Sequence, residues 1–212
     1  MAVRNRRGKS LETRRQILAA AVSIIGNKGY TGATVDEIVQ EAGVSKGTAY
    51  VHFKNKAAIA QCVLEEGIGQ LTEEFESIVE DSQNAAEALV GMIEVFSARI
   101  FENRDFGRFF VSELWRDGRV WSDTMREYEE RLLTDLTDQI KRGQGEGFLR
   151  SDVDPEFEAV AIVGMVLTTA LYYIGIDQND SYSSKEEEEQ DLELKQKEFV
   201  DRICDFIRHA NM

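Results

Sequence analysis

A single proline, Pro155, interrupts the 212-residue chain. Proline punctuates turns and edge strands, so an all-β chain of this length would need more of it. Its scarcity favours long, uninterrupted helices. Hydrophobic residues make up 42% of the chain and charged residues 30%, which is typical of a globular protein. The chain is therefore predicted to be all-α.

Hydrophobic spacing and capping residues predict where the helices begin and end. The stretch Thr34-Val35-Asp36-Glu37 has the spacing of a capping box, and Asp154 followed by Pro155 is a specific helix start. The polar stretch at 177–190 is expected to be a mobile loop. The expected helices cover residues 10–28, 34–42, 45–53, 55–80, 84–103, 105–117, 122–143, 155–175 and 191–209.

Charge is distributed unevenly along the chain. The formal net charge is −14, but residues 1–56 carry ten Lys or Arg and four Asp or Glu, a net of +6. Residues 57–212 therefore carry a net of −20. Such asymmetry predicts a basic domain over 1–56 that meets a polyanion and an acidic domain over 57–212 that does not.

Residues 34–56 carry the strongest motif: two short capped helices joined by a glycine-containing turn, the pattern of a helix-turn-helix. The second helix has small residues that allow close approach to a groove, and donors of the kind that contact phosphates and base edges. Lysines at the start of the following helix add charge. The predicted DNA-contacting residues are Thr34, Ser45, Lys46, Gly47, Thr48, Tyr50, His52, Lys54 and Lys56.

Several of these residues also have a purely structural interpretation. Thr34 and Ser45 cap helices whether or not they touch a phosphate. Tyr50 could instead cover the core of the motif, and His52 could lie on the surface without a role. The basic residues Arg4, Arg6 and Arg7 form either an arm that follows the minor groove or an inert solubilising tail.

Residues 13–60 resemble the DNA-binding domain of the TetR/AcrR-like family of transcriptional regulators. The matching stretches are the Ile17…Ala20-Ala21 face, Lys28-Gly29-Tyr30, residues 34–38, residues 42–48, Tyr50, His52-Phe53 and Lys56. Ile25, Val39 and Ala49 depart mildly from the family pattern, which affects the expected operator sequence and not DNA binding. The resemblance implies about nine helices, a homodimer built on the last two, and a variable ligand pocket in the helical body.

The sequence carries no clear motif of an enzyme or of a metal site. The two histidines, His52 and His209, belong to no Glu-x-x-His pair, so helical metal sites lack ligands. No catalytic metal and no cofactor are expected. Cys62 and Cys204 are interpreted as small buried hydrophobes. The N-terminus has charge without an apolar stretch behind it, which predicts no signal peptide and a cytoplasmic protein.

The body is rich in aromatic residues between 96 and 173. Core packing uses most such residues, yet together with threonines inside an apolar helix they could enclose a mostly apolar cavity with few polar anchors. The candidate effector-pocket residues are Phe96, Phe106, Phe110, Trp115, Trp121, Tyr128, Met165, Thr168 and Tyr172. Their chemistry favours a small, largely apolar effector.

The segment Ala159–Ile176 holds 18 residues without a charge, the lower limit for a membrane span. Its acidic flanks and its polar residues favour a buried core helix or a subunit interface instead. With the last helix it is expected to form a twofold four-helix bundle. The candidate interface residues are Gly164, Thr168, Leu171, Phe199, Ile203 and Phe206.

These features together predict a homodimeric, ligand-responsive transcriptional repressor that places residues 45–53 in successive major grooves of a palindromic operator. A small effector would release it from double-stranded DNA. Within the same fold, an activator or an effector-independent regulator remains an alternative. The remote alternative is a helical protein that binds a small molecule and does not bind DNA.

Overall fold

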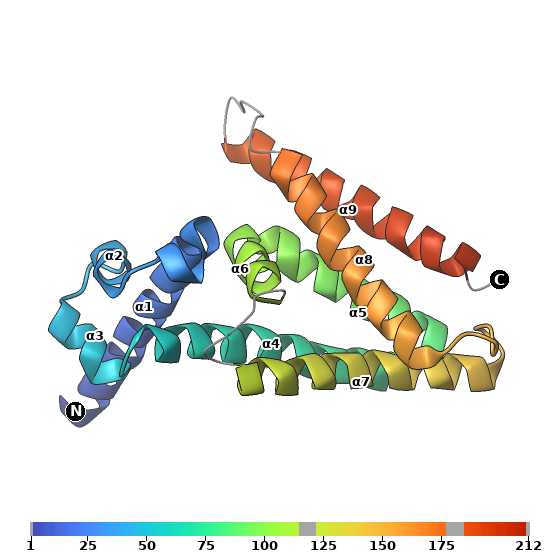
Figure 1. Cartoon of the computed structure of the whole chain (residues 1–212), viewed down its shortest axis with the longest axis horizontal. Coiled ribbons are helices and arrows are strands. Elements are labelled where there is room, and N and C mark those ends of the chain that lie inside the picture. Colours follow the sequence, from blue (N-terminus) through green and yellow to red (C-terminus); the bar gives the residue numbers. More distant parts are fainter. Residues whose placement is uncertain (1, 115–121, 177–184, 211–212) are drawn as a thin grey trace. The chain divides into compact units, whose positions relative to one another are not determined.

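The computed structural model describes residues 2–114, 122–176 and 185–210, and these residues form α-helices with no strand among them (Figure 1). The helices are α1 (Ala2–Gly32), α2 (Val35–Glu41), α3 (Lys46–His52), α4 (Lys56–Asp81), α5 (Ala85–Glu102), α6 (Arg104–Leu114), α7 (Ser122–Glu146), α8 (Pro155–Ile176) and α9 (Lys185–Ala210). The all-α prediction is confirmed, with helix ends mostly within three residues of the expected ones.

Two segments differ from the expectation. Helix α1 begins at Ala2, so the backbone over Arg4–Arg7, expected as an arm or a tail, is helical. Helix α9 begins at Lys185, so the run Lys185–Gln190, expected within a mobile loop, is helical as well. Alanine, arginine, lysine, glutamate and glutamine are all strong helix formers, and glutamates are further favoured at a helix N-terminus.

Among the described glycines with a positive φ, two end helices of the first 45 residues. Gly29 has φ of 71° and ψ of 160°, which breaks α1 before its last residues. Gly43 has φ of 66° in the turn between α2 and α3. Both turns were predicted at these glycines, because residues with a Cβ rarely adopt this conformation.

The chain divides into two compact units, the first within residues 1–69 and 105–125 and the second within 70–104 and 126–212. In the first unit, α1, α2 and α3 pack against one another. Their buried apolar side chains form one core together with those at the start of α4. This core contains Ile17, Leu18, Ala21, Ile25, Ile38, Ala49, Phe53, Ile59 and Ala60.

The first turn of α6 packs tightly within this first unit. A Cβ built on Gly26 of α1 would lie 2.4 Å from the backbone carbonyl oxygen of Asp105, and one on Gly67 of α4 would lie 2.4 Å from Cζ of Phe106. A side chain at position 26 would collide with the backbone of α6, and one at position 67 would have to displace the ring of Phe106.

In the second unit, α5 packs against both α8 and α9. The ring centroids of Phe101 and Phe199 lie 5.2 Å apart at the contact of α5 with α9. At the other end of α5, the amide of Ala85 donates to Oε2 of Glu146, 3.0 Å away, which ties the end of α7 to the start of α5.

Helix α8 has two different faces. Ala159, Ile162, Val166 and Ala170 follow a spacing of three and four residues and are buried, whereas Tyr172 is exposed. No helix of the described part of the chain combines the length and apolarity needed to cross a membrane. Within the second unit, α8 packs against α5 and α9.

Candidate nucleic-acid interface

Side-chain caps build the helix-turn-helix from its sequence. The Thr34 hydroxyl accepts from the amide of Glu37, and a Glu37 carboxylate oxygen accepts from the amide of Thr34 at 2.9 Å, which completes the predicted capping box. The Ser45 hydroxyl accepts from the amide of Thr48 at 3.1 Å and lies 2.7 Å from the Thr48 hydroxyl. These bonds satisfy amides that α2 and α3 would otherwise leave unpaired.

A lysine of α1 stabilises the capping box through its glutamate. Nζ of Lys28, at the end of α1, donates to Oε1 of Glu37 at 2.6 Å. That bond, with those from Thr34, lowers the pKa of the Glu37 carboxyl to about 2. Glu37 therefore stays ionised at every physiological pH and fixes the entry to α2.

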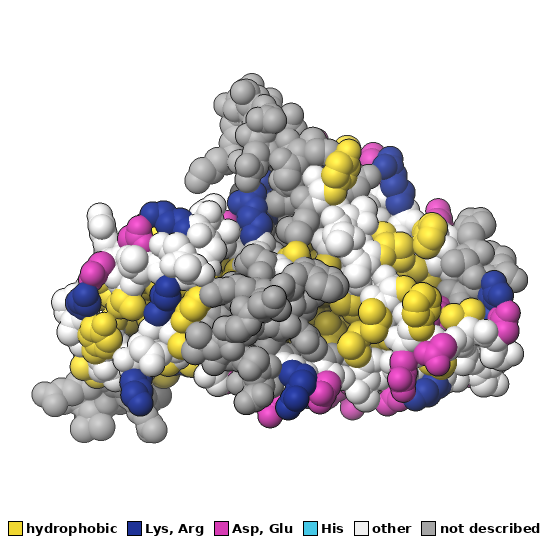
Figure 2. Space-filling model, in the orientation of Figure 1, with side chains coloured by type: hydrophobic (Ala, Val, Ile, Leu, Met, Phe, Trp, Pro, Cys, Tyr) yellow, Lys and Arg dark blue, Asp and Glu magenta, His cyan; other side chains and the backbone are white. Residues whose placement is uncertain are grey.

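Helix α3 exposes most of the residues that were predicted to contact DNA. Lys46, Gly47 and Tyr50 are exposed, and Thr48 and His52 are half-buried, while Ala49 is buried against α1 and α2. The side-chain hydrogen-bond donors of α3 therefore lie on the solvent-accessible surface of one short helix. In Figure 2, Lys and Arg side chains are spread over the visible face of this first unit.

Lys46 is held by an acidic partner on the neighbouring helix. Its Nζ lies 2.7 Å from Oδ1 and 3.0 Å from Oδ2 of Asp36, on α2. This bond raises the pKa of Lys46. A carboxylate and a phosphate each offer a lysine a pair of anionic acceptors, so Asp36 competes with any phosphate that Lys46 contacts.

Lys56, predicted to contact DNA, has a structural role in this unit. Its Nζ donates to the backbone carbonyls of Tyr30 and Ala33, each at 2.6 Å, and lies 4.3 Å from the centroid of the Tyr30 ring. The ammonium thereby satisfies carbonyls at the end of α1. Lys54, two residues earlier, is exposed and free to face a phosphate.

One exposed side chain of α3 is missing from the predicted set. Val51 is 83% exposed, the highest value among the large hydrophobic side chains of the described residues. Sequence reasoning passed over it because it searched this helix for donors. Its position two residues after the buried Ala49 was the signal that could have found it.

The candidate pocket residues are divided between the two units. Phe106 and Phe110 stack in the first unit, with ring centroids 6.2 Å apart. In the second unit Phe96 is buried, Met165 is half-buried, and Thr168 and Tyr172 are exposed. Trp115 and Trp121 lie outside the described residues, as does the side chain of Tyr128. The predicted pocket stays a prediction.

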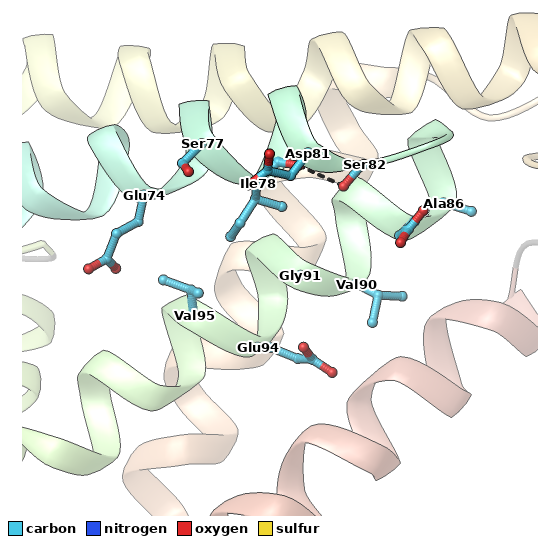
Figure 3. Close-up of a pocket in the computed structure, with 11 residues that line it drawn as sticks. Glu74, Ser77, Ile78, Asp81, Ser82, Ala86, Val90, Gly91, Glu94 and Val95 are labelled. Carbon is cyan, nitrogen blue, oxygen red and sulfur yellow. Dashed lines mark hydrogen bonds between the residues drawn. The ribbon is translucent and has the colours of Figure 1, made fainter.

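Two grooves lie in the second unit, and neither is lined by a predicted pocket residue. The larger, of about 710 Å³, runs between α4 and α5, where Figure 3 shows Glu74 and Ile78 projecting from α4 and Val90 and Glu94 from α5. The second, of about 440 Å³, lies between α5 and α9. Four carboxylates line the larger groove, those of Glu74, Asp81, Glu87 and Glu94, and this groove is a different site from the predicted pocket.

The candidate interface residues also fall into two groups. Phe199 and Ile203 are buried within the second unit itself, whereas Phe206 and Thr168 are exposed and Gly164 is half-buried. The side chain of Leu171 lies outside the described set. The interface stays a prediction, and its α9 contribution rests on Phe206.

The structure also places the possible metal ligands and the two cysteines. No group of three His, Cys, Asp or Glu residues lies there in a position to hold a metal ion. Cys204 is buried, and burial raises the pKa of the half-buried Cys62 thiol. A thiol held in its protonated form is a poor nucleophile.

Comparison with known proteins gives matches to two parts of the chain. Residues 17–63 match bacterial regulatory proteins of the tetR family, and residues 86–173 match the tetracyclin repressor-like C-terminal domain. The chain belongs to the TetR family. It is therefore a DNA-binding transcriptional regulator, with α2 and α3 as its helix-turn-helix.

Individual TetR-family relatives cover most of the chain. The chain is 26% identical, over 77% of its length and 84% of the relative's, to the fatty acid metabolism regulator protein of Bacillus subtilis (strain 168). A solved structure of FadR from Bacillus subtilis in complex with stearoyl-CoA has a TM-score of 0.73 at 24% identity, covering 90% of this chain and 97% of the other. A structure of AibR with isovaleryl coenzyme A and operator DNA has a TM-score of 0.69 at 20% identity, covering 92% and 97%.

Proposed function

We propose that this TetR-family regulator represses transcription as a homodimer on a palindromic operator, and that a fatty-acyl thioester releases it. The observation that carries the DNA-binding half is the exposed face of α3, with Lys46 and Tyr50 on a helix otherwise anchored by Ala49. Acting on a chromosomal operator, the protein works in the cytoplasm.

Exposed apolar side chains on α8 and α9 support the homodimer. Phe157, Val160 and Tyr172 of α8 and Leu194 and Phe206 of α9 are all more than half exposed. Aromatic and aliphatic side chains gathered on two helices are typical of a subunit interface, and closing two such faces forms an isologous four-helix bundle. A single small DNA-binding domain buries too little area for specific binding. A dimer doubles the surface that contacts DNA.

The effector class is inferred from two kinds of support. The body is rich in aromatic residues, and the curated relative from Bacillus subtilis is named for fatty acid metabolism. The solved relatives hold stearoyl-CoA and isovaleryl coenzyme A. A long acyl chain fits the small, largely apolar effector that the sequence predicts. The acidic groove between α4 and α5 does not suit the anionic phosphates of the coenzyme.

A competition experiment tests the effector. The full-length protein is used to select a duplex from a random-sequence pool, and its binding is followed by fluorescence anisotropy with stearoyl-CoA, free coenzyme A or buffer. Typical allosteric coupling predicts that saturating stearoyl-CoA raises the dissociation constant about 5- to 150-fold. Free coenzyme A serves as the control and is expected to leave it unchanged.

Two results would overturn parts of this proposal. Unchanged DNA affinity at saturating stearoyl-CoA would remove the acyl effector. A promoter reporter that carries the selected duplex separates repression from activation, since deletion of the regulator raises expression in the first case and lowers it in the second.

A further inference from the structure

The exposed surface of α3 has a definite centre, which is set by its one buried residue. Successive residues of an α-helix are rotated by about 100°, so Gly47 and Val51, two residues before and after Ala49, each lie about 160° from it. Ala49 is 1% exposed and faces the core. Gly47 and Val51 therefore form the stripe that points directly away from the protein.

The polar residues of α3 lie on the two sides of this stripe. By the same rotation, Lys46 and Tyr50 lie about 60° and 100° from Ala49 in one direction, and His52 and Thr48 lie about 60° and 100° in the other. A helix that enters a major groove turns its outermost stripe to the base edges and its flanks to the phosphate walls. Base reading is thus assigned to the stripe of Gly47 and Val51.

Gly47 lets this stripe approach the groove floor. A Cβ at this position would have Oγ of Ser45, at 3.9 Å, as its nearest neighbour, so the space around Gly47 is open. One turn further along, Val51 stands out with 83% of its surface exposed. Single exposed hydrophobic residues are ordinary on protein surfaces. Val51 is distinguished by its place at the centre of the reading face.

Valine limits what can be read there. Its isopropyl group neither donates nor accepts a hydrogen bond, so it gains nothing from a phosphate or from the polar atoms of guanine, adenine or cytosine. The C5-methyl group of thymine is the apolar feature of a major groove. We infer that Val51 contacts a thymine C5-methyl group in each half-site and sets a preference for T·A at that position.

This inference rests on the DNA-binding function of α3 and is tested on DNA that the full-length protein selects from a random-sequence pool. Each thymine of the selected duplex is replaced in turn, in both half-sites, by deoxyuridine, which lacks only the methyl group. For the parent protein, one thymine position should weaken binding about fourfold per half-site, the effect of burying one methyl-sized group.

Variants at position 51 tie that loss to the valine. Val51→Ala should bind more weakly and lose its sensitivity to deoxyuridine at that one position, while Val51→Ile should keep it. Phe148→Ala, which truncates an exposed aromatic residue in the second unit, is the control and should behave as the parent. Because Val51 is exposed, its truncation leaves the core of α3 intact.

Two outcomes would overturn the inference, and they can be told apart. If Val51→Ala keeps the deoxyuridine profile of the parent, or if no thymine in the half-site is sensitive, then Val51 does not read a methyl group although DNA binding stands. If the protein enriches no sequence from the pool, the DNA-binding function itself fails.

Discussion

Lys46 on α3 and Asp36 on α2 form an ion pair across the helix-turn-helix, with Lys46 Nζ 2.7 Å from Asp36 Oδ1. Both side chains are more than half exposed, so the pair lies on the surface that we propose faces DNA. A phosphate that contacts Lys46 must therefore displace the Asp36 carboxylate or share the lysine with it. The carboxylate reduces the gain from every phosphate contact that Lys46 makes, whatever the base sequence.

The first prediction follows from this pair. Asp36→Asn should strengthen binding to any duplex about two- to fivefold, because an exposed ion pair contributes at most about 1 kcal/mol. The ratio of affinity for the selected duplex over a scrambled one should not rise. Glu41→Gln removes a charge from the same helix without breaking an ion pair among the described residues and serves as the control. Equal affinity of Asp36→Asn and Glu41→Gln would show that the pair does not compete with phosphate.

The second prediction concerns acid stability. Because the pKa of Glu37 is lowered from 4.5 to about 2, its bonds to Lys28 and Thr34 stabilise the native state above pH 4.5. That stabilisation is lost as the pH falls through about 2. The free energy of unfolding of the parent, measured by urea denaturation, should therefore exceed that of Glu37→Gln near neutral pH and approach it in acid. A difference that is constant from pH 7 to pH 2 would contradict this assignment.

The third prediction compares two glycines of α4. Gly67→Ala places a Cβ against the ring of Phe106 and should destabilise the protein by about 1–3 kcal/mol, the usual effect of overpacking. Gly69→Ala, two residues further along, meets no atom within 4 Å and should stabilise it by about 0.5–1 kcal/mol, since alanine is the better helix former. Thermal denaturation of both variants measures the difference, and equal shifts would argue against the close contact of α6 with α4.

The fourth prediction concerns the subunit interface. Phe206→Glu places a charge on an exposed aromatic position of α9, and an unpaired charge buried between subunits costs several kcal/mol. Analytical ultracentrifugation should then show a monomer with native helix content. Phe148→Glu makes the same change at an exposed position outside α8 and α9 and should remain dimeric. If Phe206→Glu also remains dimeric, the interface lies elsewhere.

Local rules account for what could be predicted from the sequence. The caps at Thr34 and Ser45 and the helix ends at Gly29 and Gly43 depend on residues within a few positions, and each was found where it was expected. The helix-turn-helix could be predicted for the same reason, because its elements are short and each carries its own start and stop signals.

Contacts distant in sequence account for what could not be predicted. Lys56 donates to the carbonyl of Tyr30, 26 residues earlier, so its charge alone suggested a phosphate contact. On α9, one apolar stripe runs over Phe199, Ile203 and Phe206, yet the first two are buried in the subunit and the last is exposed. Periodicity identifies such a stripe without showing how tertiary packing divides it.

The salt dependence of DNA binding tests the central claim most directly. Anisotropy of the selected duplex with the full-length protein should give a log–log slope of about −0.9 per phosphate neutralised. Lys46→Ala should weaken binding and reduce the slope by about 1 per half-site, whereas Tyr50→Phe should weaken binding without changing it. A parent affinity that is independent of salt, or equal for the selected and a scrambled duplex, would contradict the assignment of α3 as the DNA-reading helix.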